Sequence, residues 1–307
     1  MRIKALALGS AAALLAFLGP ATLAQQAQPA APAPAAAPVQ RVATPALWKV
    51  SDKDTTIYLF GTIHLLPEGI DWYHGKLATA FESSGELVTE LPDIPAGEAA
   101  SLSLKMGTLP AGQSLRAGMN PDELAKYEGA MTSLGLPPGA FDRFKPWFAA
   151  VALAIVPLQR AGYSMDNGIE TQLDKRNKSL GRPRFGLETL EYQLGIFDGL
   201  PEAVQRKYLF DVIDAVPTIP QDIGKMVDAW VKGDAAELAV LLNSETDDPA
   251  LYDALLTKRN KNWAVWIDNR LDKPGVVFIA VGAGHLGGKD SVQELLRKQK
   301  IKAVRVQ

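Results

Sequence analysis

The chain of 307 residues contains no cysteine and three histidines. The absence of cysteine excludes disulfides, thiol nucleophiles, thiolate metal sites and a lipoprotein-type acylated cysteine. The net charge is -2, and no block of lysine or arginine is long enough to form a nucleic-acid footprint. We therefore expect no nucleic-acid partner. The hydrophobic fraction of 47% is typical of a globular protein with a sizeable core.

The first 24 residues have the pattern of a cleavable signal peptide. Two cations precede an apolar stretch from Ala5 to Leu18, and small residues follow at the spacing that a signal peptidase needs. Because this stretch is shorter than the roughly 20 residues that span a bilayer, we expect cleavage after Ala24 and no transmembrane anchor afterwards. Residues 25–45, rich in Ala, Pro and Gln, are predicted to be a disordered linker. These features predict a periplasmic or secreted protein of a Gram-negative bacterium.

Two apolar runs, each closed by a glycine, define the expected centre of the fold. One run leads to Gly61 and His64, and the other leads to Gly282 and His285. Such runs of β-branched and aromatic residues predict buried strands of a parallel sheet, in which ligands bind beyond the carboxyl ends of the strands. A single histidine after a strand is more often structural. Two histidines at the same offset from a glycine, in a histidine-poor chain, favour a functional site.

The rest of the pattern predicts an α/β (α+β) fold, with a split, mixed and largely parallel sheet built from both chain ends. Further short strands, the first of them at a sheet edge, are expected at residues 46–50, 86–91, 182–188 and 303–306. Two large helical insertions are expected at about residues 95–180 and 190–271, where helical patterns are broken by proline and glycine. We assign residues 46–307 to a single domain.

Two acidic residues are expected close to the histidines, because Glu90 and Glu188 also end predicted strands. Two neutral imidazoles and a carboxylate are a common ligand set for a divalent ion. An ion held in this way lowers the pKa of its bound water and polarises a carbonyl group, which favours hydrolysis. Without a metal, the same residues could provide a histidine general base that a carboxylate orients. The residue pattern leaves both mechanisms open.

Three further residues are candidates for the same site. Arg259 and Asn262, on a helix predicted between residues 251 and 267, could reach the site as electrophilic or orienting groups. Tyr163 could line its pocket, although a turn explains the surrounding residues equally simply. The dinucleotide-binding pattern at residues 282–287 lacks the acidic residue expected roughly 20 positions further on, so we predict no dinucleotide cofactor.

At these residues the sequence resembles the TraB/GumN family, which also includes PrgY and the Tiki proteins. The resemblance covers nearly everything from Trp48 to the C-terminus, and its supporting segments are residues 163–168, 186–189 and 258–263. It is carried by Gly61-Thr62-Ile63-His64, Glu90 and Gly282-Ala283-Gly284-His285. Tiki proteins are membrane-associated, metal-dependent proteases that favour manganese or cobalt, and PrgY restrains a peptide pheromone. The resemblance implies catalytic or metal-binding roles for the two histidines and the glutamate.

Together, these observations predict a periplasmic metal-dependent hydrolase that cleaves peptide bonds. In this hypothesis His64, Glu90 and His285 hold a manganese, cobalt or zinc ion that activates water. A metal-independent esterase with histidine as general base is one alternative. A protein that sequesters a peptide or small ligand without turnover is another.

Overall fold

The structure, a computed structural model, describes residues 40–243 and 249–307. The predicted signal peptide and most of the predicted linker lie outside the described residues. The strands are β1 (Arg41–Val42), β2 (Leu47–Ser51), β3 (Thr55–Thr62), β4 (Ile70–Asp71), β5 (Glu86–Thr89), β6 (Arg184–Gly186), β7 (Gly275–Gly282) and β8 (Val304–Arg305). The helices are α2 (Gly75–Ser83), α3 (Ala96–Gly107), η1 (Arg116–Gly118), α4 (Pro121–Ser133), α5 (Pro146–Arg160), α6 (Ile169–Ser179), α7 (Leu190–Asp198), α8 (Glu202–Ala215), α9 (Ile219–Val231), α10 (Ala235–Asn243), α11 (Pro249–Tyr252), η2 (Asp253–Thr257), α12 (Lys258–Leu271), η3 (Ala283–Leu286) and α13 (Val292–Lys298).

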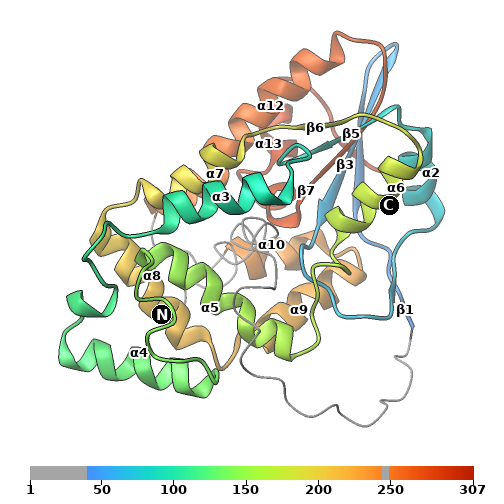
Figure 1. The fold of residues 1–307 in the computed structure, drawn as a ribbon. Helices are drawn as coiled ribbons and strands as arrows, with labels where there is room; N and C mark the ends of the chain where they lie inside the picture. The colour runs from blue at the N-terminus through green and yellow to red at the C-terminus, as the bar shows by residue number, and fades with distance from the viewer. Residues whose placement is uncertain (1–39, 244–248) are drawn as a thin grey trace.

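A six-stranded mixed sheet organises the molecule, with the strand order β6-β5-β7-β3-β2-β8. Neighbouring strands from β6 to β3 are parallel, whereas β2 is antiparallel to both β3 and β8. The predicted α/β fold, with a sheet built from both chain ends, is therefore confirmed (Figure 1). One detail was wrong: β2 is not an edge strand, because β8 pairs with it. Strand β7 lies between β3 and β5.

The central position of β7 follows from its residues, which are apolar on both faces. Val277, Ile279 and Val281 pack on one face of the sheet against α12 and α13. Phe278 and Ala280 pack on the other face, against residues of α2, α6 and α9. A strand that is apolar on both faces is buried only where helices cover both sides of the sheet. This placement brings the carboxyl ends of β3, β7 and β5 side by side.

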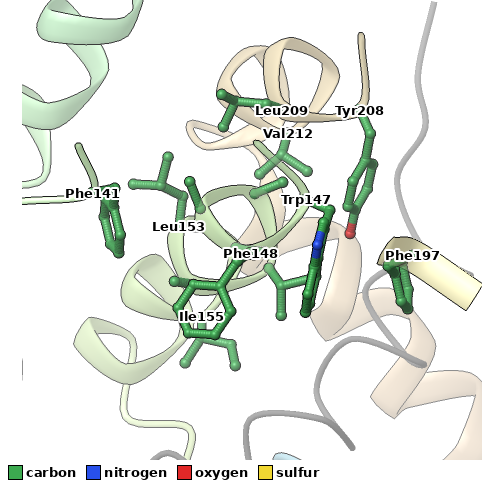
Figure 2. Close-up of a cluster of buried hydrophobic side chains, with 14 of the residues drawn as sticks. Phe141, Trp147, Phe148, Leu153, Ile155, Phe197, Tyr208, Leu209 and Val212 are labelled. Atoms are coloured by element: carbon green, nitrogen blue, oxygen red, sulfur yellow. The ribbon is translucent and has the colours of Figure 1, made fainter. Parts of the chain in front are cut away.

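The two helical insertions share a hydrophobic core that is separate from the two faces of the sheet, while others of their helices, among them α6 and α12, pack on the sheet. The first runs from α3 to α6 and the second from α7 to α12. Their shared core is centred on the aromatic side chains in Figure 2, where the Trp147 ring of α5 stacks on Phe197 of α7 at a centroid distance of 6.0 Å. In Figure 1, α4, α5 and α8 lie to the left of the sheet. The site described below lies where this helical core meets the strand ends.

The folded part of the chain begins before the predicted boundary at residue 46. Strand β1 pairs with β4, and the backbone N–H of Ala43 donates to the Asp71 carbonyl at 2.7 Å. Because Ala43 is fully buried, residues 41–45 belong to the fold rather than to a linker. Within residues 40–243 and 249–307, every helix is too short or too polar to cross a membrane.

Candidate functional site

The carboxyl ends of β3, β5 and β7 bring His64, Glu90 and His285 to one point beside Gly282. A β-carbon added to Gly282 would lie 3.1 Å from Glu90 Oε1, 3.7 Å from His285 Cδ2 and 3.9 Å from His64 Nε2. The backbone N–H of Gly282 donates to Glu90 Oε1 at 2.8 Å. Glu90 and His285 are buried, whereas 13% of the His64 side chain is exposed. We call the point beside Gly282 where these groups meet the Gly282 cradle.

The carboxylates of Glu90 and Glu188 are held together by buried donors from two helices, α7 and α12. The Arg259 guanidinium, which is 1% exposed, donates to Glu90 Oε2 at 2.6 Å and to both Glu188 oxygens at 3.0 Å. The Gln193 amide donates to Glu90 Oε2 at 3.0 Å and to Glu188 Oε2 at 2.9 Å. Trp263 Nε1 donates to Glu188 Oε1 at 2.9 Å. Two buried carboxylates are tolerated here because each one is paired and hydrogen-bonded.

Every nitrogen of the Arg259 guanidinium is committed to a protein acceptor. Nε donates to Glu188, and Nη2 is shared between Glu90 and Glu188. Nη1 donates to the Leu255 carbonyl at 3.1 Å and lies 3.2 Å from His285 Nε2. Since arginine has no acceptor atom and its donors are in use, this side chain orients the other groups. The electrophilic role that the sequence left open for it is not available in this arrangement.

The hydrogen bonds around His285 define its tautomer. The Asn260 amide donates from Nδ2 to the Asp290 carbonyl at 2.8 Å, which turns Oδ1 toward His285 Nδ1 at 2.6 Å. An amide oxygen only accepts, so Nδ1 carries the proton and Nε2 presents a lone pair. The Arg259 guanidinium donates to that lone pair. Both ring nitrogens of His285 are therefore used inside the protein.

The surroundings of His64 are different. His64 Nδ1 lies 2.8 Å from Glu170 Oε1, and the hydroxyl of Thr62 donates to the same carboxylate oxygen. Glu170 lies in the first turn of α6, and the Ile169 N–H fixes this turn by donating to the Ile63 carbonyl at 3.1 Å. A carboxylate on Nδ1 places the proton there and leaves Nε2 facing the Gly282 cradle. His64 Nε2 has no hydrogen-bond partner among the described residues.

The electrostatic environments give the two histidines opposite pKa shifts. Burial and the positive charge of Arg259 lower the pKa of His285 to about 3, so this ring is neutral at neutral pH. Burial also lowers the pKa of His64, but the carboxylates of Glu170 and Glu90 outweigh it and raise the pKa above 6.5. Burial raises the pKa of Glu90, but Arg259 outweighs it and keeps that pKa well below its usual range. Of these two histidines, His64 therefore holds a proton more readily than His285.

Two glycines let the elements of the site approach closely. A β-carbon on Gly61 would lie 3.0 Å from the Ala283 Cα, so the two histidine turns pack backbone to backbone. A β-carbon on Gly168 would lie 2.0 Å from the His64 carbonyl oxygen, which leaves no room for any side chain. This contact seats the start of α6 on the His64 turn and so places Glu170 beside the imidazole.

Two residues that we predicted for the site lie elsewhere. Asn262 is on the solvent-exposed side of α12, because about 100° of helix rotation per residue places it roughly 200° from Asn260, which contacts His285. Tyr163 lies between the helical and sheet cores, and its hydroxyl faces Gly224 of α9. The residues that the structure does bring together are His64, Glu90, Glu188, Arg259, His285, Gly61 and Gly282. Sequence reasoning missed Thr62, Glu170, Gln193 and Asn260.

The donor atoms fit a divalent ion only in part. Both histidines have Nδ1 anchored by an acceptor, as metal-ligating histidines do. However, Arg259 donates to His285 Nε2 and to Glu90 Oε2, so a guanidinium faces two of the three expected ligands. Within residues 40–243 and 249–307, no group of three His, Asp or Glu side chains is placed to hold a metal ion. As arranged, the predicted ligand set does not fit a three-ligand site.

Comparisons with known proteins agree with the family suggested by the histidine turns. The model of the TraB/PrgY/gumN family matches residues 46–305, and the chain belongs to this family. It is 24% identical to the uncharacterized protein YbaP of Escherichia coli K12 over 78% of this chain and 87% of that protein. It is 23% identical to an uncharacterized protein of Treponema pallidum, over 83% of this chain and 80% of that protein. No solved structure matches the chain.

Proposed function

We propose that this TraB-family protein is a periplasmic hydrolase of peptide bonds in which His64 is the general base. The observation that carries the proposal is the orientation of His64, whose Nδ1 is bound to Glu170 while Nε2 faces the Gly282 cradle. An imidazole oriented by a carboxylate, with its second nitrogen free, is the arrangement that general-base catalysis requires. The export pattern of the N-terminus supports a periplasmic location, which cell fractionation would test.

The other charged groups of the site support this assignment by elimination. His285 uses both ring nitrogens, and Arg259 uses all its donors. Glu90 accepts hydrogen bonds at both oxygens, and its low pKa makes it a poor base. His64 is also the most exposed of these four residues, so water reaches it most easily.

The reaction follows from these roles. His64 Nε2 takes a proton from a water molecule whose oxygen forms a bond to the carbonyl carbon of the substrate. Glu170 stabilises the resulting imidazolium, as the orienting carboxylate does in other acid–base sites. The carbon–nitrogen bond then breaks, and His64 returns the proton to the leaving nitrogen. The products are a carboxylic acid and an amine, and the enzyme regains its starting state.

A peptide library digested by the purified protein and read by mass spectrometry tests the proposal. The wild-type protein is expected to cleave a subset of peptides, and His64→Gln is expected to lose about 100-fold or more of the rate. The matched control is His74→Gln, because His74 is the remaining histidine and lies at the start of α2. Equal cleavage by wild type and His64→Gln would contradict the assignment. Cleavage of esters but not of peptides would favour the esterase alternative, and recovery of an intact bound ligand would favour sequestration.

Metal-dependent hydrolysis is the second candidate, supported by the anchored Nδ1 atoms of His64 and His285 beside the Gly282 cradle. Manganese, cobalt or zinc held there would supply Lewis-acid activation of water. The same digestion in the presence of a chelator separates the candidates. Full activity in chelator favours the general-base mechanism, and loss of activity that added metal restores favours the metal.

A further inference from the structure

We infer that the Arg259 guanidinium takes the place of a divalent ion, so that the cation of this site is part of the chain. The inference goes beyond the proposed function, because it concerns what occupies the centre of the site and not what the site cleaves. It rests on the contacts of Arg259 with two carboxylates and one imidazole, whose side chains are at most 7% exposed.

The partners of Arg259 are the atoms that a transition-metal ion prefers. Glu90 Oε2 and both Glu188 oxygens accept from the guanidinium at 2.6–3.0 Å, and His285 Nε2 lies 3.2 Å from Nη1. Carboxylate oxygen and neutral imidazole nitrogen are typical ligands of zinc and cobalt. The planar fork of arginine satisfies two carboxylates at once, which makes it a suitable substitute for a small cation.

The guanidinium is also held firmly in place. Its Cζ lies 4.9 Å from the ring centre of Trp263, and Nη1 is bound to the Leu255 carbonyl one helical turn earlier. Movement of this side chain out of the site would leave Glu90 and Glu188 as unpaired buried charges, which is strongly unfavourable. A metal ion would therefore have to compete with an internal cation whose five N–H groups are already satisfied.

Metal content after equilibrium dialysis against zinc or cobalt tests the inference without any assay of turnover. The wild-type protein is expected to retain no stoichiometric metal. Arg259→Met removes the cation, keeps most of the apolar stem and frees the donors, so about one equivalent should bind. That metal should be lost again when His285→Ala is added. Arg297→Met, which removes an exposed arginine of α13, is the control and should behave like the wild type.

Two results would overturn the inference. The first is a wild-type protein that retains one equivalent of metal and loses it in His285→Ala. The second is an Arg259→Met protein that is folded by near-ultraviolet circular dichroism and still binds no metal. If Arg259→Met does not fold, Arg259→Gln replaces it, and the wild-type measurement decides in either case. A metal-free protein that cleaves no peptide would contradict the proposed function and leave this inference standing.

Discussion

His64 and His285 each lie three residues beyond a glycine near the end of a strand, yet the protein surrounds them with opposite charges. The His64 ring meets the carboxylates of Glu170 and Glu90, and it remains partly exposed. The His285 ring is buried against the Arg259 guanidinium and the Asn260 amide. One ring therefore gains protons more readily than a free histidine, and the other resists protonation. Equal spacing in the sequence does not imply equal chemistry.

The sheet register explains why the two turns differ. Gly61 pairs with Val281, and Gly282 pairs with Thr62, so the two glycines are out of step by one residue. Successive residues of a strand point to opposite faces, and a shift of one residue sends the following segments in different directions. The chain after Gly282 enters the 3₁₀ turn η3, whereas the chain after Gly61 continues to His64 without a helical turn. The following predictions test this contrast, from the largest effect to the smallest.

Removal of Arg259 should destroy the environment of His285. Arg259→Met leaves the buried carboxylates of Glu90 and Glu188 without their cation, and we expect a loss of about 3–5 kcal/mol in the free energy of unfolding. Urea denaturation, monitored by circular dichroism, measures this loss. Arg297→Met should change the same quantity by less than about 0.5 kcal/mol, because its side chain is 68% exposed. Similar values for the two variants would mean that the buried network contributes little.

A side chain at Gly168 should disrupt the environment of His64. Gly168→Ala places a methyl group against the His64 carbonyl, and we expect about 2–3 kcal/mol of destabilisation together with displacement of Glu170. Gly129→Ala, in the exposed part of α4 where a β-carbon meets nothing within 4 Å, should instead stabilise by about 0.5–1 kcal/mol. Urea denaturation of both variants measures the change in the free energy of unfolding. A change of the same sign in both variants would contradict the prediction.

The two histidines should affect stability in opposite directions as the pH changes. The pKa of His285 is about 3 in the fold and near 6.5 when unfolded, so acid favours the unfolded chain below pH 6.5. Between pH 7 and pH 5 this costs about 2 kcal/mol, a loss that His285→Gln should lack. The raised pKa of His64 works the other way, because its contribution is present below pH 6.5 and is lost as the pH rises through the folded pKa. Urea denaturation from pH 5 to pH 8 measures both, and parallel curves for wild type and His285→Gln would contradict the assignment.

Loss of the Thr62 hydroxyl should have the smallest effect. Thr62→Val removes one of two hydrogen bonds to Glu170 Oε1 and leaves the bond from His64, so we expect about 1 kcal/mol of destabilisation. Thermal denaturation provides the measurement. A loss as large as that of Gly168→Ala would show that the hydroxyl, and not the seating of α6, holds this side of the site.

Local elements could be predicted from the sequence, but the strand order could not. Helix α4 begins where Pro121 and the capping pair Asn120 and Glu123 predict it, because these signals act over a few residues. The insertion of β7 between β3 and β5 depends on contacts between opposite ends of the chain. No short sequence pattern predicts this strand order, although the apolar character of both faces of β7 is consistent with a central position.

In the site, too, local features of single residues could be predicted from the sequence, whereas their long-range contacts could not. The strand-ending positions of His64, Glu90, Glu188 and His285 are visible in the sequence because strand ends are local features. The choice between Asn260 and Asn262 depends on how α12 is rotated against the sheet, which its neighbours decide. Glu170 could have been suspected from its place just after the supporting segment 163–168, but its contact with His64 depends on the close approach at Gly168.

The central position of β7 also determines when the protein can fold during synthesis. Thr55 pairs with Gly275, 220 positions later in the chain, so a ribosome must make most of the polypeptide before the middle of the sheet exists. Until then β3 and β5 present unpaired edges, which favour aggregation. A nascent chain with this strand order therefore benefits from staying unfolded until its last strands emerge. Truncation of the chain before residue 282 should abolish folding.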